Sequence, residues 1–157
     1  MRLPLPDDGN DYLAAHAALL ARSHRHWTGR ELIAPAPDAA TLARALFNAP
    51  FVLLSHDTAP DPVLNYGNLA ALALWETDWQ TLTAMPSRLT AERAARADRE
   101  RLLERVNHHG FLDDYQGVRV TSSGRRFHIE RATVWTLVDA AGAYRGQAAA
   151  FSRWEYL

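Results

Sequence analysis

The C-terminal part of the chain alternates apolar and polar residues with a period of two, and this pattern constrains the fold more than any other feature. Segments rich in β-branched and aromatic residues span 111–121, 125–138 and 144–156. They are separated by Ser122-Ser123-Gly124 and by Ala140-Ala141-Gly142, which are connections of hairpin length. The sequence therefore predicts three antiparallel strands joined as a meander.

Two shorter apolar runs, 51–55 and 63–66, precede this meander and are predicted to form a further pair of antiparallel strands. Asn68 follows directly, and its side chain is predicted to cap the N-terminus of the most apolar helix. The helices predicted between the second and third strands span 69–76, 79–83 and 91–108. This order of elements predicts an α+β fold in which one face of the sheet packs against the inserted helices.

The first 46 residues are predicted to be a helical extension of the domain formed by residues 47–157. Apolar residues recur at three- and four-residue spacing from 11 to 27, which indicates an amphipathic helix. After a linker with two prolines, Asp38 is predicted to cap a second helix. If the apolar stripe of the first helix does not pack on its own sheet, this helix is the predicted contact of a homodimer.

The composition excludes several functions. The chain has no cysteine, which excludes disulfides, thiolate nucleophiles, cysteine-ligated zinc and a cysteinyl flavin adduct. All 17 basic residues are arginine, so Schiff-base chemistry through lysine and a P-loop are excluded as well. A net charge of -1 gives no field for nucleic acid, and no stretch approaches the roughly 18 apolar residues of a membrane span. We therefore expect a cytoplasmic protein without nucleic-acid or membrane partners.

Five stretches of the sequence resemble the MEKHLA family, a group of PAS-like domains. They are FNAPFVLLSH (47–56), DPVLNYGN (61–68), MPSRLTAE (85–92), GFLDDYQGVRVTSSGRRFHIERATVW (110–135) and YRGQAAAF (144–151). Members of this family occur alone in bacteria and at the C-terminus of plant class III homeodomain leucine-zipper transcription factors, and this chain resembles the stand-alone bacterial form. The resemblance implies a PAS-like, five-stranded antiparallel sheet with helices inserted between strands 2 and 3. It also implies a sensory or binding role, and it carries over no catalytic residues.

PAS-type domains commonly hold small ligands between the inner face of the sheet and the covering helices, so the resemblance implies a pocket there. Trp75 and Trp135 are predicted to supply apolar walls for an amphipathic ligand with an aromatic or heteroaromatic part. The polar residues predicted to contact such a ligand are Asn65, Tyr66, His56, Arg131 and His128. The sequence identifies neither the ligand nor a partner that would receive the signal.

The alternation of segment 125–136 leaves open which of its faces lines the pocket. If the face with Phe127 and Ile129 is the inner one, Arg131 lies among apolar neighbours and needs a carboxylate from the protein or from a ligand. If the other face is the inner one, His128 and Glu130 take that place. Either arrangement is compatible with a polar or anionic ligand.

Two other functions remain open from the sequence. A small metal-assisted or cofactor-independent biosynthetic enzyme would use His56, His128 and an aspartate as acid and base in the same pocket. A ligand-free interaction module would have a filled core and would only dimerise.

Haem ligation would have to use His108 or His109, which is a poor position for a buried axial ligand because it is a helix end. No metal site is predicted, because the histidines of the first helix do not share one face.

Overall fold

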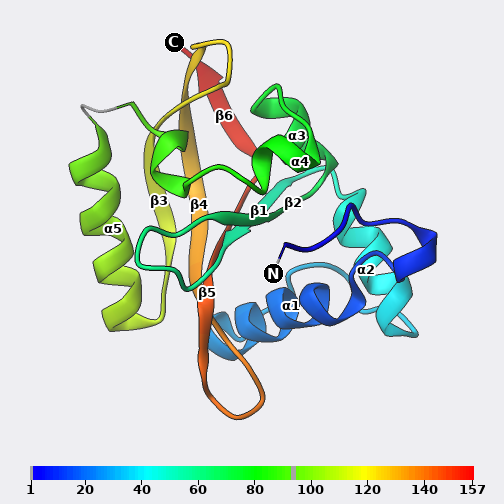
Figure 1. Cartoon of the computed structure of the whole chain (residues 1–157). Coiled ribbons are helices and arrows are strands. Elements are labelled where there is room, and N and C mark those ends of the chain that lie inside the picture. Colours follow the sequence, from blue (N-terminus) through cyan, green and yellow to red (C-terminus); the bar gives the residue numbers. More distant parts are fainter. Residues whose placement is uncertain (1, 93–94) are drawn as a thin grey trace.

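The sheet has the strand order β2-β1-β5-β4-β3, and a short sixth strand pairs with β4 beyond the end of β5 (Figure 1). The computed structural model describes residues 2–92 and 95–157. All pairings in the sheet are antiparallel, so the predicted α+β class and five-stranded antiparallel sheet are confirmed. The strands are β1 (Val52–His56), β2 (Leu64–Gly67), β3 (Phe111–Val120), β4 (Arg126–Val138), β5 (Tyr144–Phe151) and β6 (Arg153–Tyr156).

Three α-helices lie between β2 and β3 in chain order, as the sequence predicts. The predicted helix 69–76 is shorter in the structure and ends at Leu74. The predicted helix 91–108 begins at Arg96 among the described residues, and positions 93 and 94 of that prediction lie outside them. The helices are α1 (Ala14–Thr28), α2 (Ala39–Phe47), α3 (Leu69–Leu74), α4 (Trp79–Leu82) and α5 (Arg96–His109), with the 3-10 turns η1 (Asp8–Asn10) and η2 (Ser87–Thr90).

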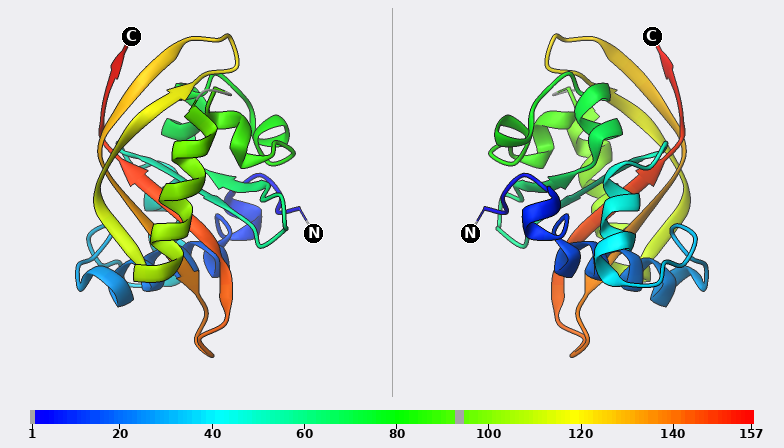
Figure 2. Two further views of the ribbon diagram at one scale, coloured as in Figure 1. Left: turned by 90° about the vertical axis from the view of Figure 1, so that its left-hand side faces the viewer. Right: turned by 90° about the vertical axis from the view of Figure 1, so that its right-hand side faces the viewer.

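Helices cover the sheet on both sides. We call the side covered by α5 the inner face and the side covered by α1 and α2 the outer face. In Figure 2, α5 lies in front of the sheet in the left view, and α1 and α2 lie in front of it in the right view. The core therefore has two main layers, one on each side of β1, β5 and β4.

The apolar stripe of α1 packs on the sheet of its own chain. Ala17 and Leu20 are fully buried, and the backbone carbonyl of Leu20 accepts a hydrogen bond of 3.2 Å from Trp135 Nε1 in β4. Dimerisation through this stripe was predicted on the condition that it is free. The structure does not meet that condition, because burying the stripe on the outer face removes the same apolar surface from water within one chain.

A bulge at Arg131 interrupts the alternation of β4. Ile129 pairs with Gly117 and Ala132 pairs with Tyr115. Between these two pairs, β4 therefore has one more residue than β3. The backbone of Arg131 accommodates this additional residue by adopting a positive φ of 50°. Because the bulge shifts the period by one residue, the inner face is formed by Ile129 before it and by Ala132 after it. The prediction that 125–136 alternates strictly is wrong, and Arg131 is exposed.

Asn68 connects three segments of the core. Its Oδ1 accepts from Ala71 N (3.0 Å) at the start of α3, which confirms the predicted helix cap, and also from Leu53 N (3.1 Å) in β1. Its Nδ2 donates to Leu46 O (3.1 Å) in α2 and to Phe51 O (2.8 Å). Through these bonds, Asn68 holds α2, β1 and α3 in place relative to one another.

Candidate functional site

A cavity of about 70 Å³ lies between the inner face of the sheet and the elements α3, η2 and α5. A water molecule needs on the order of 10–15 Å³ of such space, so the cavity has room for about five water-sized groups. Most of its wall is apolar, with contributions from every strand except β6. The apolar lining residues include Leu54, Leu64, Leu102, Ile129, Val134 and Phe151.

Two arginines form the charged part of this wall. Arg99 on α5 is 6% exposed and Arg119 on β3 is 8% exposed, although both carry a full positive charge. Arg99 donates to Ser87 Oγ in η2, and Arg119 donates to Val118 O at 2.9 Å. The guanidinium of Arg119 also lies 5.5 Å from the centre of the Tyr115 ring.

Neither buried guanidinium has a carboxylate partner among the described residues. The salt bridges near them join other residues: Asp61 pairs with Arg88, and Glu92 pairs with Arg126. Burial, together with the nearby charge of Arg119, lowers the pKa of Arg99 to about 10. Glu100 and Asp61 oppose this shift without forming a salt bridge to Arg99, so the cavity wall holds two positive charges that have no direct carboxylate partner among the described residues.

His56 and Gln147 form a neutral polar pair on the same wall. The two residues are opposite each other in the β1–β5 ladder, and His56 Nε2 lies 3.3 Å from Gln147 Oε1. Gln147 Nε2 donates to Asn107 Oδ1 at 2.9 Å, which connects the pair to α5. Burial lowers the pKa of His56, so the imidazole is neutral at pH 7.

Trp75 is a further lining residue, and it has a buried polar atom. Its ring packs edge-on against Phe127, with ring centroids 5.2 Å apart, and it lines the cavity. Its Nε1–H is buried and has no hydrogen-bond partner among the described residues. A buried donor of this kind is normally satisfied, so an acceptor is expected next to it.

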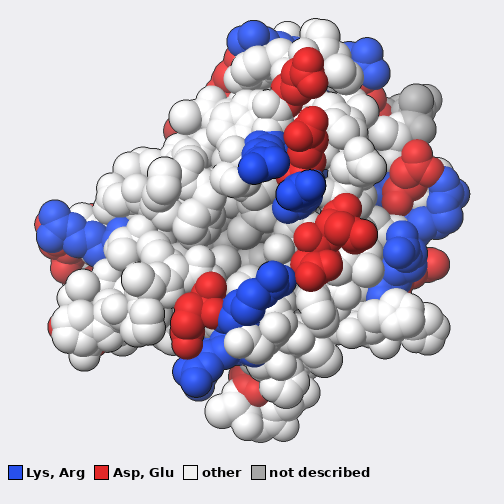
Figure 3. All heavy atoms as spheres, turned by 180° about the vertical axis from the view of Figure 1, so that it is seen from behind, with Lys and Arg blue, Asp and Glu red and all other residues white. Residues whose placement is uncertain are grey.

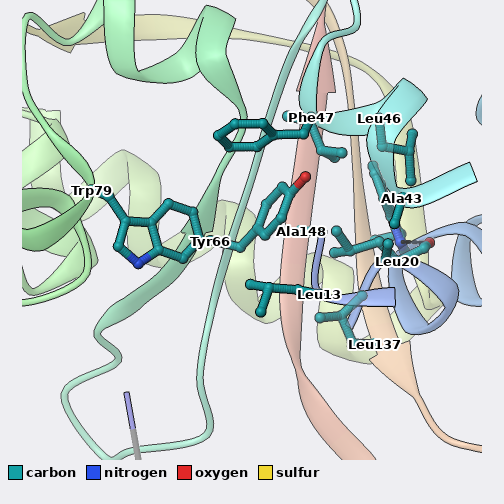
Figure 4. Close-up of a cluster of buried hydrophobic side chains, with 12 residues drawn as sticks. Leu13, Leu20, Ala43, Leu46, Phe47, Tyr66, Trp79, Leu137 and Ala148 are labelled. Atoms are coloured by element: carbon teal, nitrogen blue, oxygen red, sulfur yellow. Dashed lines mark hydrogen bonds between the residues drawn. The ribbon is translucent and has the colours of Figure 1, made fainter. Parts of the chain in front are cut away.

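Of the residues that the sequence predicts as ligand contacts, the structure brings His56 and Trp75 to this cavity. Tyr66 and Trp135 instead lie in the core of the outer face, where Figure 4 shows Tyr66 next to Trp79 and Phe47. The hydroxyl of Tyr66 has no partner among the described residues, and burial raises its pKa. Trp75 and Trp135, which were predicted to form the walls of one pocket, therefore lie on opposite sides of the sheet.

Asn65 belongs to a polar cluster that faces α1. Ser55 Oγ donates to Asn65 Oδ1 at 2.6 Å and lies 3.0 Å from His16 Nε2. Burial lowers the pKa of His16 to about 4, so this imidazole is neutral at pH 7. Asn65 contributes to the attachment of α1 and does not line the cavity on the inner face.

His128 and Arg131 lie outside the cavity. His128 is half-buried in β4 and pairs with Val118 and Glu155 on the neighbouring strands. Arg131 is exposed at the bulge and borders a shallow surface hollow together with Asp113. His56 and His128 therefore do not meet as an acid and base pair, and no aspartate or glutamate of the described chain lines the cavity.

Sequence reasoning missed the two buried arginines. Arg99 lies in a helix with many charged residues. Its residue type does not distinguish it from exposed arginines of the same helix such as Arg101. A signal was available, because Arg99, Leu102 and Val106 are spaced by three and four residues and so share one helix face. Arg119 gives no comparable signal, since neighbouring residues of β3 are only partly buried.

The remaining surface offers few sites for metals or polyanions. Among the described residues, no three histidine, aspartate or glutamate side chains gather as metal ligands. His108 and His109, the candidates for haem, are exposed at the end of α5. Basic and acidic side chains are interspersed over the face seen in Figure 3. No described helix is long and apolar enough to cross a membrane.

Comparison with known proteins gives a family and a fold. The model of the MEKHLA domain matches residues 14–156. The PAS domain of a protein from Colwellia psychrerythraea superposes with a TM-score of 0.62 at 10% identity, covering 74% of this chain and 94% of that one. The light-state dimer of the fungal blue-light photoreceptor Vivid gives a TM-score of 0.58 at 13% identity, covering 94% and 95%. A light-oxygen-voltage domain studied with a flavin analogue gives 0.53 at 18% identity, covering 74% and 84%. The search of curated proteins finds no match.

Proposed function

Because the chain belongs to the MEKHLA domain family and has the PAS fold, we propose that it is a sensory or regulatory domain that binds a small molecule in the cavity of the inner face. The observation that carries this proposal is the cavity itself, which is covered by helices and lined by Trp75, Arg99 and Arg119, side chains whose donors are not all bonded among the described residues. An interaction module with a filled core would not need buried donors that face a cavity. An enzyme would need an acid and base pair at the cavity, and the histidines suggested for that role lie apart.

The size of the cavity limits the ligand. Drug-sized ligands and ring cofactors occupy roughly 300–1,000 Å³, and this cavity measures about 70 Å³. A ligand of flavin size therefore does not fit the structure as it stands. The proposed ligand is much smaller than the amphipathic aromatic molecule expected from the sequence, and His56 and Trp75 remain its proposed contacts from that prediction.

The signal would leave the domain through protein contacts on its N-terminal extension, residues 1–46. In strand β5, Gln147 and Ala149 line the cavity, Ala150 packs in the layer under α1 and α2, and Ala148 contacts both. A shift of β5 on ligand binding is thus transmitted directly to the extension. A homodimer contact would use the exposed polar side of α1, and the protein would act in the cytoplasm.

Two neighbouring alanines on opposite faces of β5 test this function. Ala149 lines the cavity and Ala150 packs on the outer face, and both are half-buried. Ala149→Leu is expected to fill the cavity and to abolish the rise in Tm that a small metabolite causes in the wild-type protein. Ala150→Leu adds the same volume on the other face and is expected to keep that rise.

The measurement is thermal unfolding of the three proteins against a panel of small metabolites. The proposed function is wrong if no compound raises the Tm of the wild-type protein, or if Ala149→Leu responds to a ligand as the wild-type protein does. Turnover of a bound compound, followed by NMR of the mixture, would favour the enzyme instead.

A further inference from the structure

The guanidinium groups of Arg99 and Arg119 have more hydrogen-bonding capacity than the protein uses. Each guanidinium carries several N–H donors in a planar fork. Among the described residues, the side chain of Arg99 bonds only to Ser87 Oγ and that of Arg119 only to Val118 O. Both side chains line the cavity and are more than nine-tenths buried. The unused donors therefore belong to buried side chains on the wall of a mostly apolar cavity.

Among the described residues, no carboxylate forms a salt bridge with Arg99 or Arg119, and Glu100 and Asp61 act on Arg99 only from a greater distance. The cavity lining contains no aspartate or glutamate of the described residues. The three residues outside the described part are a methionine, an arginine and an alanine, so none of them can supply a carboxylate side chain. A buried charge without a partner is unfavourable, and a like charge beside it adds repulsion. An anion bound between the two guanidiniums would remove both costs.

The rest of the wall selects among anions. Leucine, isoleucine, valine and phenylalanine side chains form most of the lining. A strongly hydrated anion such as phosphate or sulfate would lose water molecules on entering the cavity, and these apolar side chains offer no hydrogen bonds to replace them. A carboxylate matches the planar guanidinium fork, and a short hydrocarbon tail matches the apolar wall. The room for about five water-sized groups restricts that tail to a few carbon atoms.

We propose that the cavity binds a small carboxylic acid with a short aliphatic tail, whose carboxylate is held by Arg99 and Arg119 and whose tail packs against Leu102, Ile129 and Val134. This inference rests on the proposed function, because it names the ligand class of the same cavity. Ser87 keeps the guanidinium of Arg99 in place. The neutral His56–Gln147 pair adds no competing charge.

The first test compares probes that differ in charge or in their apolar part. Isothermal titration calorimetry of the wild-type protein is carried out with butyrate, butyramide and inorganic phosphate. Butyrate is expected to bind at least tenfold more tightly than butyramide, which has a similar shape and no charge. Phosphate is expected to bind more weakly than butyrate, because it has no apolar part.

The second test compares arginines of one helix. Arg99→Met is expected to weaken butyrate binding at least tenfold, and Arg119→Met is expected to do the same. Arg101→Met removes an exposed arginine two positions along α5, whose partner is Asp98, and is expected to leave the affinity unchanged. Without butyrate, Arg99→Met is expected to unfold at the same temperature as the wild-type protein or a higher one, since it removes an unpaired buried charge.

The outcomes separate this inference from the proposed function. If neutral compounds bind and are blocked by Ala149→Leu while butyrate does not bind, the cavity is a ligand site and the carboxylate assignment is wrong. Equal affinity of Arg99→Met and wild-type protein for butyrate, or tighter binding of phosphate than of butyrate, would also overturn the assignment. If no probe binds and Ala149→Leu has no effect, the proposed function itself fails.

Discussion

Replacement of Asn68 by alanine is expected to lower the free energy of unfolding by about 3 kcal/mol or more. The side chain is fully buried and makes hydrogen bonds to Leu53 N, Ala71 N, Leu46 O and Phe51 O. Alanine leaves Leu53 N, Ala71 N and Phe51 O without this partner, while Leu46 O keeps its bonds from the backbone N–H groups of Asn48 and Ala49. Each unpaired buried group costs about 1–3 kcal/mol, and partial entry of water reduces the sum.

Urea denaturation followed by circular dichroism measures this loss. Asn48→Ala is the matched control, since Asn48 makes one exposed side-chain bond, to Arg44 O, and its replacement is expected to cost less than about 1 kcal/mol. Asn68→Asp keeps an acceptor for the N–H groups of Leu53 and Ala71. It also places a carboxylate oxygen, which cannot donate, next to the carbonyl oxygens of Leu46 and Phe51. It is expected to be as unstable as Asn68→Ala. Similar stabilities of Asn68→Ala and Asn48→Ala would show that Asn68 is only a local helix cap.

Replacement of Gly146 by alanine is expected to destabilise the protein by about 3 kcal/mol or more. Gly146 has φ 120°, a conformation that residues with a side chain rarely adopt. A Cβ atom there would lie 2.0 Å from the backbone oxygen of His56, so β5 could not approach β1 as it does. Because His56 lines the cavity, the substitution would also disturb the ligand site.

Gly142 provides the control for this effect. It also has a positive φ, of 80°, but no atom lies within 4 Å of the position that its Cβ would take. Gly142→Ala therefore carries only the conformational cost, about 1–2 kcal/mol. The difference between the two variants in urea denaturation isolates the close approach of β5 to β1. Equal losses would contradict the geometry described here.

The sequence was sufficient for those parts of the fold that local chemistry determines. The meander, the strand pair before it and the cap at Asn68 are confirmed, because period-two alternation, turn residues and capping side chains act over a few residues. The bulge at Arg131 was not predictable, since nothing in the residue type of an arginine favours a positive φ.

The composition of the ligand site was harder to predict for a different reason. Both faces of β4 are buried, one under α5 and the other under α1, so large apolar residues occur on both. Trp135 fits the outer face as well as it would fit a pocket wall, and the sequence does not distinguish the two. Arg99 was overlooked for the opposite reason, because a charged residue in a charged helix is normally exposed.

The most direct measurement of the central claim is the indole N–H signal of Trp75 in ¹⁵N-labelled protein during a titration with butyrate. The side chain of Trp75 lines the cavity and its buried Nε1–H has no partner among the described residues, while the Nε1–H of Trp135 is bonded to Leu20 O on the other side of the sheet. A ligand in the cavity is expected to shift the Trp75 signal and to leave the Trp135 signal in place. A Trp75 signal that stays unchanged at saturating butyrate, or a shift confined to Trp135, would contradict a binding site on the inner face.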